Sequence, residues 1–235
     1  MAPVEHLLVF GASGALGTAV CDLAVRKGWL VTGISRSPPA QVVAGVTYLS
    51  LDPLSDRFSA AALGRGYTCV CWAQGSNLND SVRSVERDRH LELYRANCLY
   101  IVETLKMVLA EGALAPASRL CVVSSIWQQL GRQNKLSYCM TKAALEGLVL
   151  SASADLASEG HLINAVMPGV VDTPMTRKNL TAAQIESITK GTQFGRLTTR
   201  TDVAALVCYL CSPDNTGITG QFIAADLGWS RVRIV

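Results

Sequence analysis

Short apolar runs alternate with longer stretches of helical periodicity along the chain. The runs are rich in β-branched residues and lie at 6–10, 29–34, 46–51, 68–73, 118–124, 161–167 and 220–226. Helical patterns lie between them, at 15–27, 54–63, 83–111, 136–158 and 200–211. Strands that are apolar on both faces and alternate with helices are typical of a parallel sheet covered on both sides. Because such crossovers are right-handed, the pattern predicts an α/β fold, a doubly wound Rossmann-type sheet of about seven strands.

The polar, Thr-rich stretch 172–199 interrupts this alternation and contains a short helical pattern near 181–190. Excursions of this kind between a strand and a helix often cover a binding site. The whole length of 235 residues suits one α/β domain. We therefore expect a single domain over 1–235, with 172–199 as its substrate lid.

Composition excludes several classes of protein. Hydrophobic residues make up 49% and charged residues 17%, which favours a large core over disorder. The net charge of +3 is small and its cations are scattered, so no nucleic-acid partner is expected. The first apolar run is short and has no basic lead, and no stretch has the ~18 apolar residues of a membrane span. These features predict a cytoplasmic protein with no membrane partner.

Most of the eight cysteines lie in apolar runs and are expected to be buried free thiols of a reducing compartment. Cys208 and Cys211 have the spacing of half a zinc site. No second pair and no nearby histidine completes that site, so no metal is expected.

A glycine-rich turn, Gly11-Ala-Ser-Gly14-Ala-Leu-Gly17, joins the first strand to the first helical pattern. Glycines let the backbone turn sharply and let a pyrophosphate approach the helix N-terminus, where N–H groups and the helix dipole favour an anion. The alternative is an ordinary strand-to-helix turn. As a dinucleotide site, the turn would supply Gly11, Ser13, Gly14, Ala15, Leu16 and Gly17.

The end of the second strand indicates which dinucleotide is bound. An acidic residue there would bind the ribose 2′-hydroxyl of NAD, but residues 23–51 contain no Asp or Glu. Arg36 can instead bind a 2′-phosphate bidentately, helped by the hydroxyls of Ser35 and Ser37. NADP(H) is therefore preferred over NAD(H). The alternative is that Arg36 is a solvated loop residue.

Tyr138 and Lys142 are four residues apart in a helical pattern, which places both side chains on one helix face. A tyrosine has a pKa of about 10, too high for an efficient base. A lysine cation about 6 Å away, at an effective dielectric of about 20, stabilises the phenolate by roughly 3 kcal/mol, or about 2 pKa units. That shift would let Tyr138 exchange a proton with an alcohol or carbonyl oxygen. Alone, the spacing could also be a surface helix pair.

Further residues make this pair specific. Ser125 ends an apolar run upstream of Tyr138, and Asn97 lies in the preceding helical pattern. With the glycine turn, this set resembles the short-chain dehydrogenase/reductase family. The resemblance covers nearly the whole chain and continues, in the family's order, through Asp52, Ala73-Gln-Gly75, Met167-Pro-Gly169-Val-Val-Asp-Thr173-Pro, Gly195-Arg-Leu, Asp202-Val-Ala, Ile218-Thr-Gly-Gln221 and Ala-Asp226-Leu-Gly228.

The resemblance implies a role for each residue of the tetrad. Tyr138 would protonate the carbonyl oxygen in reduction, or deprotonate the alcohol in the reverse reaction. Lys142 would lower the pKa of Tyr138 and bind the nicotinamide ribose. Ser125 would orient the substrate oxygen, and Asn97 would hold a water that links Lys142 to solvent. The cofactor would also contact Asp52, Ala73, Gln74, Gly75, Asn97, Tyr138, Pro168, Gly169, Val171 and Thr173.

In the family, the loop after Ser125 lines the substrate pocket. The expected lining is Ser125, Trp127, Gln128, Leu130 and, from the lid, Met175, which favours a partly apolar substrate. The alternative for Trp127 is core packing under the lid. The chain departs from the family's usual pattern at Gly14 and Ala15, where the glycine spacing differs, and at Trp72, Gln74 and Leu227.

These observations predict an NADP(H)-dependent oxidoreductase that reduces a ketone or aldehyde to an alcohol, or the reverse. Two alternatives are an NADP(H)-binding sensor or assembly protein without turnover, and an epimerase or dehydratase on the same scaffold. The complete tetrad argues against the first, and the short stretch after Asp202 argues against the second. No Ser–His–Asp set is visible in the sequence. The resemblance further implies a homodimer or homotetramer through the helices carrying Asn97 and Tyr138.

Overall fold

The computed structural model describes residues 4–55, 60–192 and 194–232. Its centre is a seven-stranded sheet in the order β3-β2-β1-β4-β5-β6-β7, and every neighbouring pair of strands is parallel. The direction of winding reverses between β1 and β4, and ligands of such sheets bind at this reversal, beyond the carboxyl ends of the strands. The strands are β1 (His6–Phe10), β2 (Leu30–Ser35), β3 (Val46–Ser50), β4 (Tyr67–Trp72), β5 (Leu114–Val123), β6 (Leu162–Pro168) and β7 (Phe222–Ala225).

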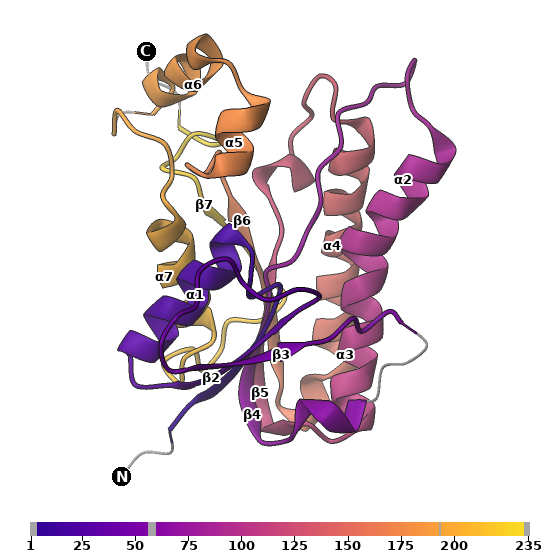
Figure 1. The fold of residues 1–235 in the computed structure, drawn as a ribbon, viewed down its shortest axis with the longest axis vertical. Coiled ribbons are helices and arrows are strands. Elements are labelled where there is room, and N and C mark those ends of the chain that lie inside the picture. Colours follow the sequence, from indigo (N-terminus) through magenta and orange to yellow (C-terminus); the bar gives the residue numbers. More distant parts are fainter. Residues whose placement is uncertain (1–3, 56–59, 193, 233–235) are drawn as a thin grey trace.

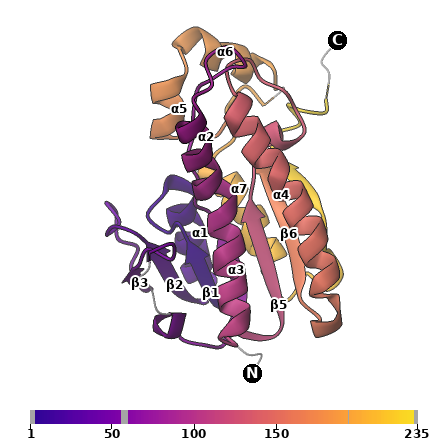
Figure 2. The ribbon, with the colours of Figure 1, turned by 90° about the vertical axis from the view of Figure 1, so that its right-hand side faces the viewer.

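Helices cover both faces of the sheet, which confirms the doubly wound α/β fold (Figure 1). On one face lie α1 (Ala15–Arg26) and α7 (Arg200–Leu210). On the other lie α3 (Tyr100–Ala110) and α4 (Leu136–Asp155), with α2 (Arg87–Tyr94) extending beyond the sheet (Figure 2). Two short helices, α5 (Pro174–Asn179) and α6 (Ala182–Lys190), lie past the carboxyl ends of the strands (Figure 1).

Successive side chains of β1 enter two different cores. Leu8 and Phe10 pack in the core that contains apolar residues of α3 and α4. Leu7 and Val9 pack in the core that contains apolar residues of α1 and α7. Because a strand alternates its side chains between faces and both faces are buried here, the four residues from Leu7 to Phe10 are all apolar, and the polar His6 is only half-buried at the start of the strand.

Three elements differ from the sequence prediction. The helix expected over 83–111 begins at Arg87 and is divided by one π-helical turn, Arg95–Leu99. β5 begins at Leu114 rather than at 118, because a bulge with a positive φ of 54° at Ala117 lets the strand continue towards its N-terminus. Of the helix expected over 54–63, the structure shows one 3₁₀ turn, Ala60–Leu63, and residues 56–59 lie outside the described residues.

The cysteines are all free thiols, and all but the half-buried Cys139 are buried. Cys208 and Cys211 lie in the core with Cys69 and Cys121. Within the described ranges, no three side chains of metal-binding type are grouped so that they could hold an ion. Within those ranges, too, no helix has the length and apolar character needed to cross a membrane.

Candidate active site

Two connected cavities lie at the carboxyl ends of the strands. The outer cavity has a volume of about 550 Å³ and is bordered by the end of β2, Asp52 and Tyr100. The inner cavity has a volume of about 460 Å³ and lies between Ser125, Tyr138 and the segment 168–180. Both are lined by Gly14 and by residues 73–77, so together they form one continuous crevice.

The glycine turn brings the start of α1 against the ends of β1 and β4. Gly11 has a φ of +80°, and a Cβ atom there would lie 2.5 Å from the backbone nitrogen of Gln74. A Cβ on Gly17 would overlap the carbonyl oxygen of Gly11. Both positions therefore require glycine for packing, and Gly17 lines neither cavity. Gly14 caps α1 with an ordinary φ of −76° and lines both cavities.

Gln74 tests whether the crevice fits a dinucleotide. Its side chain lines both cavities. Its amide nitrogen and oxygen are buried and have no hydrogen-bond partner among the described residues. An unpaired buried polar group costs about 1–3 kcal/mol, so this amide favours a polar ligand. Together with the start of α1, where the first N–H groups of a helix have no partner within the helix, it fits the predicted nicotinamide cofactor.

The outer cavity carries the positive charge expected for a phosphate. Arg36 is exposed directly after β2 and lines this cavity with Ser35. The hydroxyl of Ser35 donates to the carbonyl oxygen of Ser37 over 2.7 Å, and Ser37 itself is not among the lining residues. Arg89 and Arg95 also line the cavity. Sequence reasoning missed them because it treated 83–111 as one helix on the sheet.

The predicted tetrad gathers around the inner cavity. Ser125, Tyr138 and Lys142 all line it, and the Nζ atom of Lys142 lies 5.8 Å from the ring centroid of Tyr138. Lys142 is buried and donates to the carbonyl oxygen of Val123 over 3.1 Å. A Cβ on Gly75 would lie 3.4 Å from Asn97 Oδ1 and 3.7 Å from Lys142 Nζ. Residues far apart in sequence therefore meet at one place.

Burial dominates the titration of the two central groups. It raises the pKa of Tyr138, while the neighbouring hydroxyl of Ser125 opposes the rise. This net direction is opposite to the lowering expected from Lys142. Burial also lowers the pKa of Lys142, to about 8, so the lysine itself loses charge in mildly alkaline solution. The cause of both shifts is that an interior disfavours the charged form.

Asn97 connects two segments of the site. Its Oδ1 accepts from the backbone nitrogen of Ser76 over 2.7 Å, and its Nδ2 donates to the Ser76 carbonyl oxygen over 3.1 Å and to the Thr141 hydroxyl over 3.0 Å. The π-helical turn places this side chain between the loop after β4 and α4. The structure thus shows Asn97 positioning the loop, and its predicted water remains a prediction.

Lys135 is a site residue that the sequence reasoning missed. It is buried and lines the inner cavity, with its Nζ atom 5.6 Å from the ring centroid of Tyr138. The ammonium group donates to Asn77 Oδ1 over 2.6 Å and to the carbonyl oxygen of Leu78 over 3.4 Å. Burial lowers its pKa to about 8. The available signal was its spacing, three residues before Tyr138, which places the two side chains as neighbours.

The fold also brings together Asp80, Ser137 and His90. The Ser137 hydroxyl donates to Asp80 Oδ2 and lies 2.8 Å from Nδ1 of His90. Ser137 is fully buried and lines neither crevice cavity, and its proton points to a carboxylate, so this is not a hydrolytic triad. Asp80 Oδ1 also accepts from the backbone nitrogen of Ser137 over 3.0 Å, which caps the start of α4.

Removal of this cap should destabilise the protein. We expect Asp80→Ala to lower the free energy of unfolding by about 2 kcal/mol, because it removes both acceptors from Ser137 and leaves its buried N–H unpaired. Urea denaturation followed by circular dichroism measures the change. Asp155→Ala, at the exposed end of the same helix, is the matched control and should stay within about 0.5 kcal/mol. Equal values for the two variants would remove Asp80 as the cap.

The structure places two of the further residues expected at the substrate pocket, Trp127 and Met175, around the inner cavity. Trp127 lines the inner cavity and packs edge-on against Trp229 at a centroid distance of 5.7 Å; Met175 also lines the cavity. Gln128 is buried instead in hydrogen bonds with Ser124 and Glu146. Leu130 is also outside the inner cavity and lines a separate hollow beside Lys190 and Trp229.

Gln128 and Leu130 therefore lie outside the lining of the inner cavity, and their contact with a substrate stays a prediction. They lie outside it because the 3₁₀ turn Ile126–Gln128 directs consecutive side chains to different sides of the loop.

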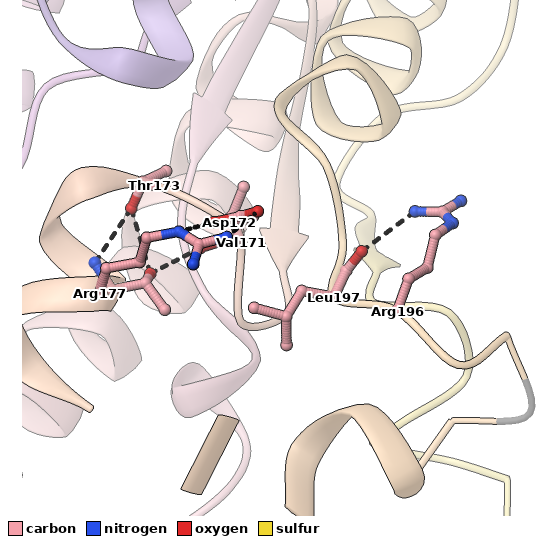
Figure 3. A network of polar contacts seen from close by, with 7 residues as sticks. Val171, Asp172, Thr173, Arg177, Arg196 and Leu197 are labelled. Carbon is pink, nitrogen blue, oxygen red and sulfur yellow. Dashed lines mark hydrogen bonds and ion pairs between the residues drawn. The ribbon is translucent and has the colours of Figure 1, made fainter. Parts of the chain in front are cut away.

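The segment 172–199 is anchored at both ends. Val171 pairs with Thr198 in a parallel bridge. Arg177 donates to both carboxylate oxygens of Asp172 at 2.8 Å, and Thr173 caps α5 by accepting from Thr176 N over 3.2 Å (Figure 3). Arg196 donates to the carbonyl oxygen of Leu197 over 3.1 Å (Figure 3). The two ends of the segment therefore lie side by side. Its first half borders the inner cavity.

Comparison with known proteins gives consistent matches. A family model described as enoyl-(acyl carrier protein) reductase matches residues 67–230. The 3-oxoacyl-(acyl-carrier-protein) reductase FabG of Vibrio harveyi is 26% identical over 238 residues, covering 96% of this chain and 97% of its own. The (S)-acetoin-forming diacetyl reductase of Staphylococcus aureus is 39% identical over 101 residues, covering 39% of each chain.

Solved structures share the fold. A short chain dehydrogenase family protein from Francisella tularensis superposes with a TM-score of 0.87 at 20% identity, covering 97% of this chain and 99% of its own. ElxO with NADP bound has a TM-score of 0.85 at 22% identity, with the same coverage. A parallel sheet wound in this order, with a crevice beyond the carboxyl ends of its strands, is typical of the class of nicotinamide-dependent oxidoreductases. The chain belongs to the short-chain dehydrogenase/reductase family.

Proposed function

We propose that the protein is an NADP(H)-dependent reductase that converts a ketone or aldehyde to an alcohol, with Tyr138 as the proton donor. The observation that carries this proposal is the meeting of Ser125, Tyr138 and Lys142 in the inner cavity, which continues into the glycine-lined outer cavity. When bound, the cofactor supplies the hydride. The raised pKa of Tyr138 keeps its phenol protonated at neutral pH, which is the form that reduction requires.

The chain's own residues carry the rest of the chemistry. The hydroxyl of Ser125, which lies beside the phenol of Tyr138, orients the carbonyl oxygen of the substrate. Tyr138 gives its proton to that oxygen as the alcohol forms. Lys142, 5.8 Å from the ring, stabilises the resulting phenolate electrostatically and binds the nicotinamide ribose. Asn97 keeps the loop after β4 in place beside both groups.

The preference for NADP(H) rests on charge in the outer cavity. Arg36, Arg89 and Arg95 line it, against Asp52 and Glu92. Arg36 follows β2 directly, where an acid would be needed to bind an unphosphorylated ribose. The structure of ElxO, which is similar in fold, contains NADP. The other cofactor contacts inferred from the sequence stand as proposals, with Gly17 in a packing role.

Two features of organisation belong to the same proposal. The chain forms one domain, and the segment 172–199 acts as the lid of the inner cavity. The protein assembles as a homodimer or homotetramer through the outer faces of α2, α3 and α4. Large apolar side chains are exposed along these helices, namely Leu91, Tyr94, Val102, Met140 and Leu150. Analytical ultracentrifugation tests the assembly, and a monomer at all concentrations would contradict it.

The activity can be tested directly. A panel of ketones and aldehydes is mixed with the protein and NADPH, and the loss of absorbance of the reduced nicotinamide is recorded. We expect turnover of at least one carbonyl compound, with NADH a poorer donor. Calorimetric binding of NADPH without any turnover across the panel and its alcohol counterparts would support the non-catalytic alternative instead.

A further inference from the structure

The inner cavity is lined by cations without acids. Arg132, Lys135 and Lys142 contribute side chains to it. None of the described residues that line it is Asp or Glu. Lys142 already has an assigned role beside Tyr138, but the proposed hydride and proton transfers do not use Arg132 or Lys135. These two side chains therefore need a different explanation.

Lys135 is held in the cavity by neutral partners. Its exposed fraction is 4%, and its hydrogen bonds go to the amide oxygen of Asn77 and to a backbone carbonyl oxygen. Asp80 is the nearby acid, but its two carboxylate oxygens accept from the nitrogen and hydroxyl of Ser137. No ion pair with Lys135 occurs within the described part of the chain. A buried ammonium group with neutral partners is costly unless an anion joins it.

Arg132 provides a second cation at the same place. Its guanidinium carbon lies 5.5 Å from the ring centroid of Trp127, which itself lines the cavity. Arg132 and Lys135 both line the inner cavity, so the two cations face a common space. A guanidinium group stacked on an aromatic ring and an ammonium group beside it are typical partners of a carboxylate.

We propose that Arg132 and Lys135 bind a carboxylate of the substrate, so that the protein acts on short oxo acids rather than on neutral ketones. The inference rests on the proposed function, because Ser125 and Tyr138 define where the reacting carbonyl group lies. Lys135 precedes Tyr138 by less than one helical turn, and its Nζ atom is 5.6 Å from the Tyr138 ring. The carboxylate therefore lies within a few bonds of the carbonyl carbon, and the rest of the substrate contacts Trp127 and Met175.

Binding to the protein loaded with NADP⁺ tests the proposal without turnover. Isothermal titration calorimetry compares 2-oxobutanoate, acetoacetate and levulinate with their methyl esters, and includes dihydroxyacetone phosphate. We expect at least one acid to bind tenfold or more tightly than its ester. Lys135→Met and Arg132→Met should each remove most of this preference. Lys178→Met, which removes the same charge from an exposed position of α5 outside the cavity lining, should keep it.

Each outcome decides the proposal. Equal binding of acids and esters, no binding of any acid, or stronger binding of the phosphate ester would overturn it. If Lys135→Met fails to fold by circular dichroism, Arg132→Met decides, because Arg132 is only half-buried. Oxidation of NADPH is measured in parallel. Turnover of neutral ketones without any acid preference would leave the reductase function intact and refute the carboxylate site. Preferential binding of acids without turnover would support the carboxylate site and refute the reductase function.

Discussion

Replacement of Tyr138 by Phe should reduce turnover of NADPH with a carbonyl substrate by at least ~10²-fold. The substitution removes one hydroxyl group and keeps the ring that borders the inner cavity. The variant keeps the hydroxyl of Ser125 but lacks the phenol that lies beside Lys135 and Lys142, so the proton for the carbonyl oxygen loses its source. The affinity for NADPH, measured by calorimetry, should change by less than about threefold, since the cradle made by the glycine turn is untouched.

Tyr209→Phe is the matched control for this experiment. Tyr209 lies on α7 and is 46% exposed, away from both cavities of the crevice. Its variant should keep full turnover and the same melting temperature. Full activity in the Tyr138 variant would refute the mechanism, whereas a joint loss of activity and NADPH affinity would indicate a structural role for the phenol.

The framework of the fold was predictable because it follows from patterns that extend over many residues. Runs such as 6–10 and 46–51 match β1 and β3 closely. Residues 7–10 are apolar because both faces of β1 are buried, whereas β3 is a half-exposed edge strand marked by its β-branched and aromatic residues. Irregular backbone was not predictable. The bulge at Ala117 and the π-helical turn Arg95–Leu99 arise from contacts between segments that are distant in sequence. Local propensity carries no information about such contacts.

The candidate site likewise contains features that were predictable from the sequence and features that were not. The positions of Ser125, Tyr138 and Lys142 follow from spacing and from the ends of strands, and the structure places them at one cavity. The direction of the pKa shift of Tyr138 was not accessible, because it depends on how deeply the folded chain buries the phenol. Lys135 was missed for the same reason, since a lysine at the start of a helix is usually solvated.

One of two departures from the family's usual pattern acquires a physical reason. Trp72 is fully buried, stacks on Phe10 at a centroid distance of 5.8 Å, and donates to the hydroxyl of Thr104 over 2.8 Å, so it links β4 to α3 within the core. Leu227 replaces a glycine and has a φ of +58°, a conformation that is strained for a residue with a side chain. The first adds packing, and nothing in the structure explains the second.

Arg36→Asp should reverse the choice of cofactor. In the proposed complex the guanidinium group binds the 2′-phosphate of NADPH with charge-assisted hydrogen bonds. Aspartate would place a carboxylate against that phosphate and could instead accept from the free 2′-hydroxyl of NADH. We expect the ratio of kcat/KM for NADPH to that for NADH to fall by about a hundredfold, as expected for the loss of roughly 3 kcal/mol of differential binding.

The position of the charge, and not the net charge of the protein, is what this substitution must test. Arg65→Asp makes the same change of charge at an exposed residue just before β4. This residue lies at the amino ends of the strands, whereas the crevice lies at their carboxyl ends. A general electrostatic effect would weaken the binding of the polyanionic cofactor in both variants. In both, the effect would disappear in 0.5 M salt, where the screening length is only a few ångströms. A contact with the 2′-phosphate would act at Arg36 alone, and it would change the ratio of the two cofactors rather than the affinity for both. An unchanged ratio in Arg36→Asp would assign the phosphate to Arg89 or Arg95, the other arginines of the outer cavity.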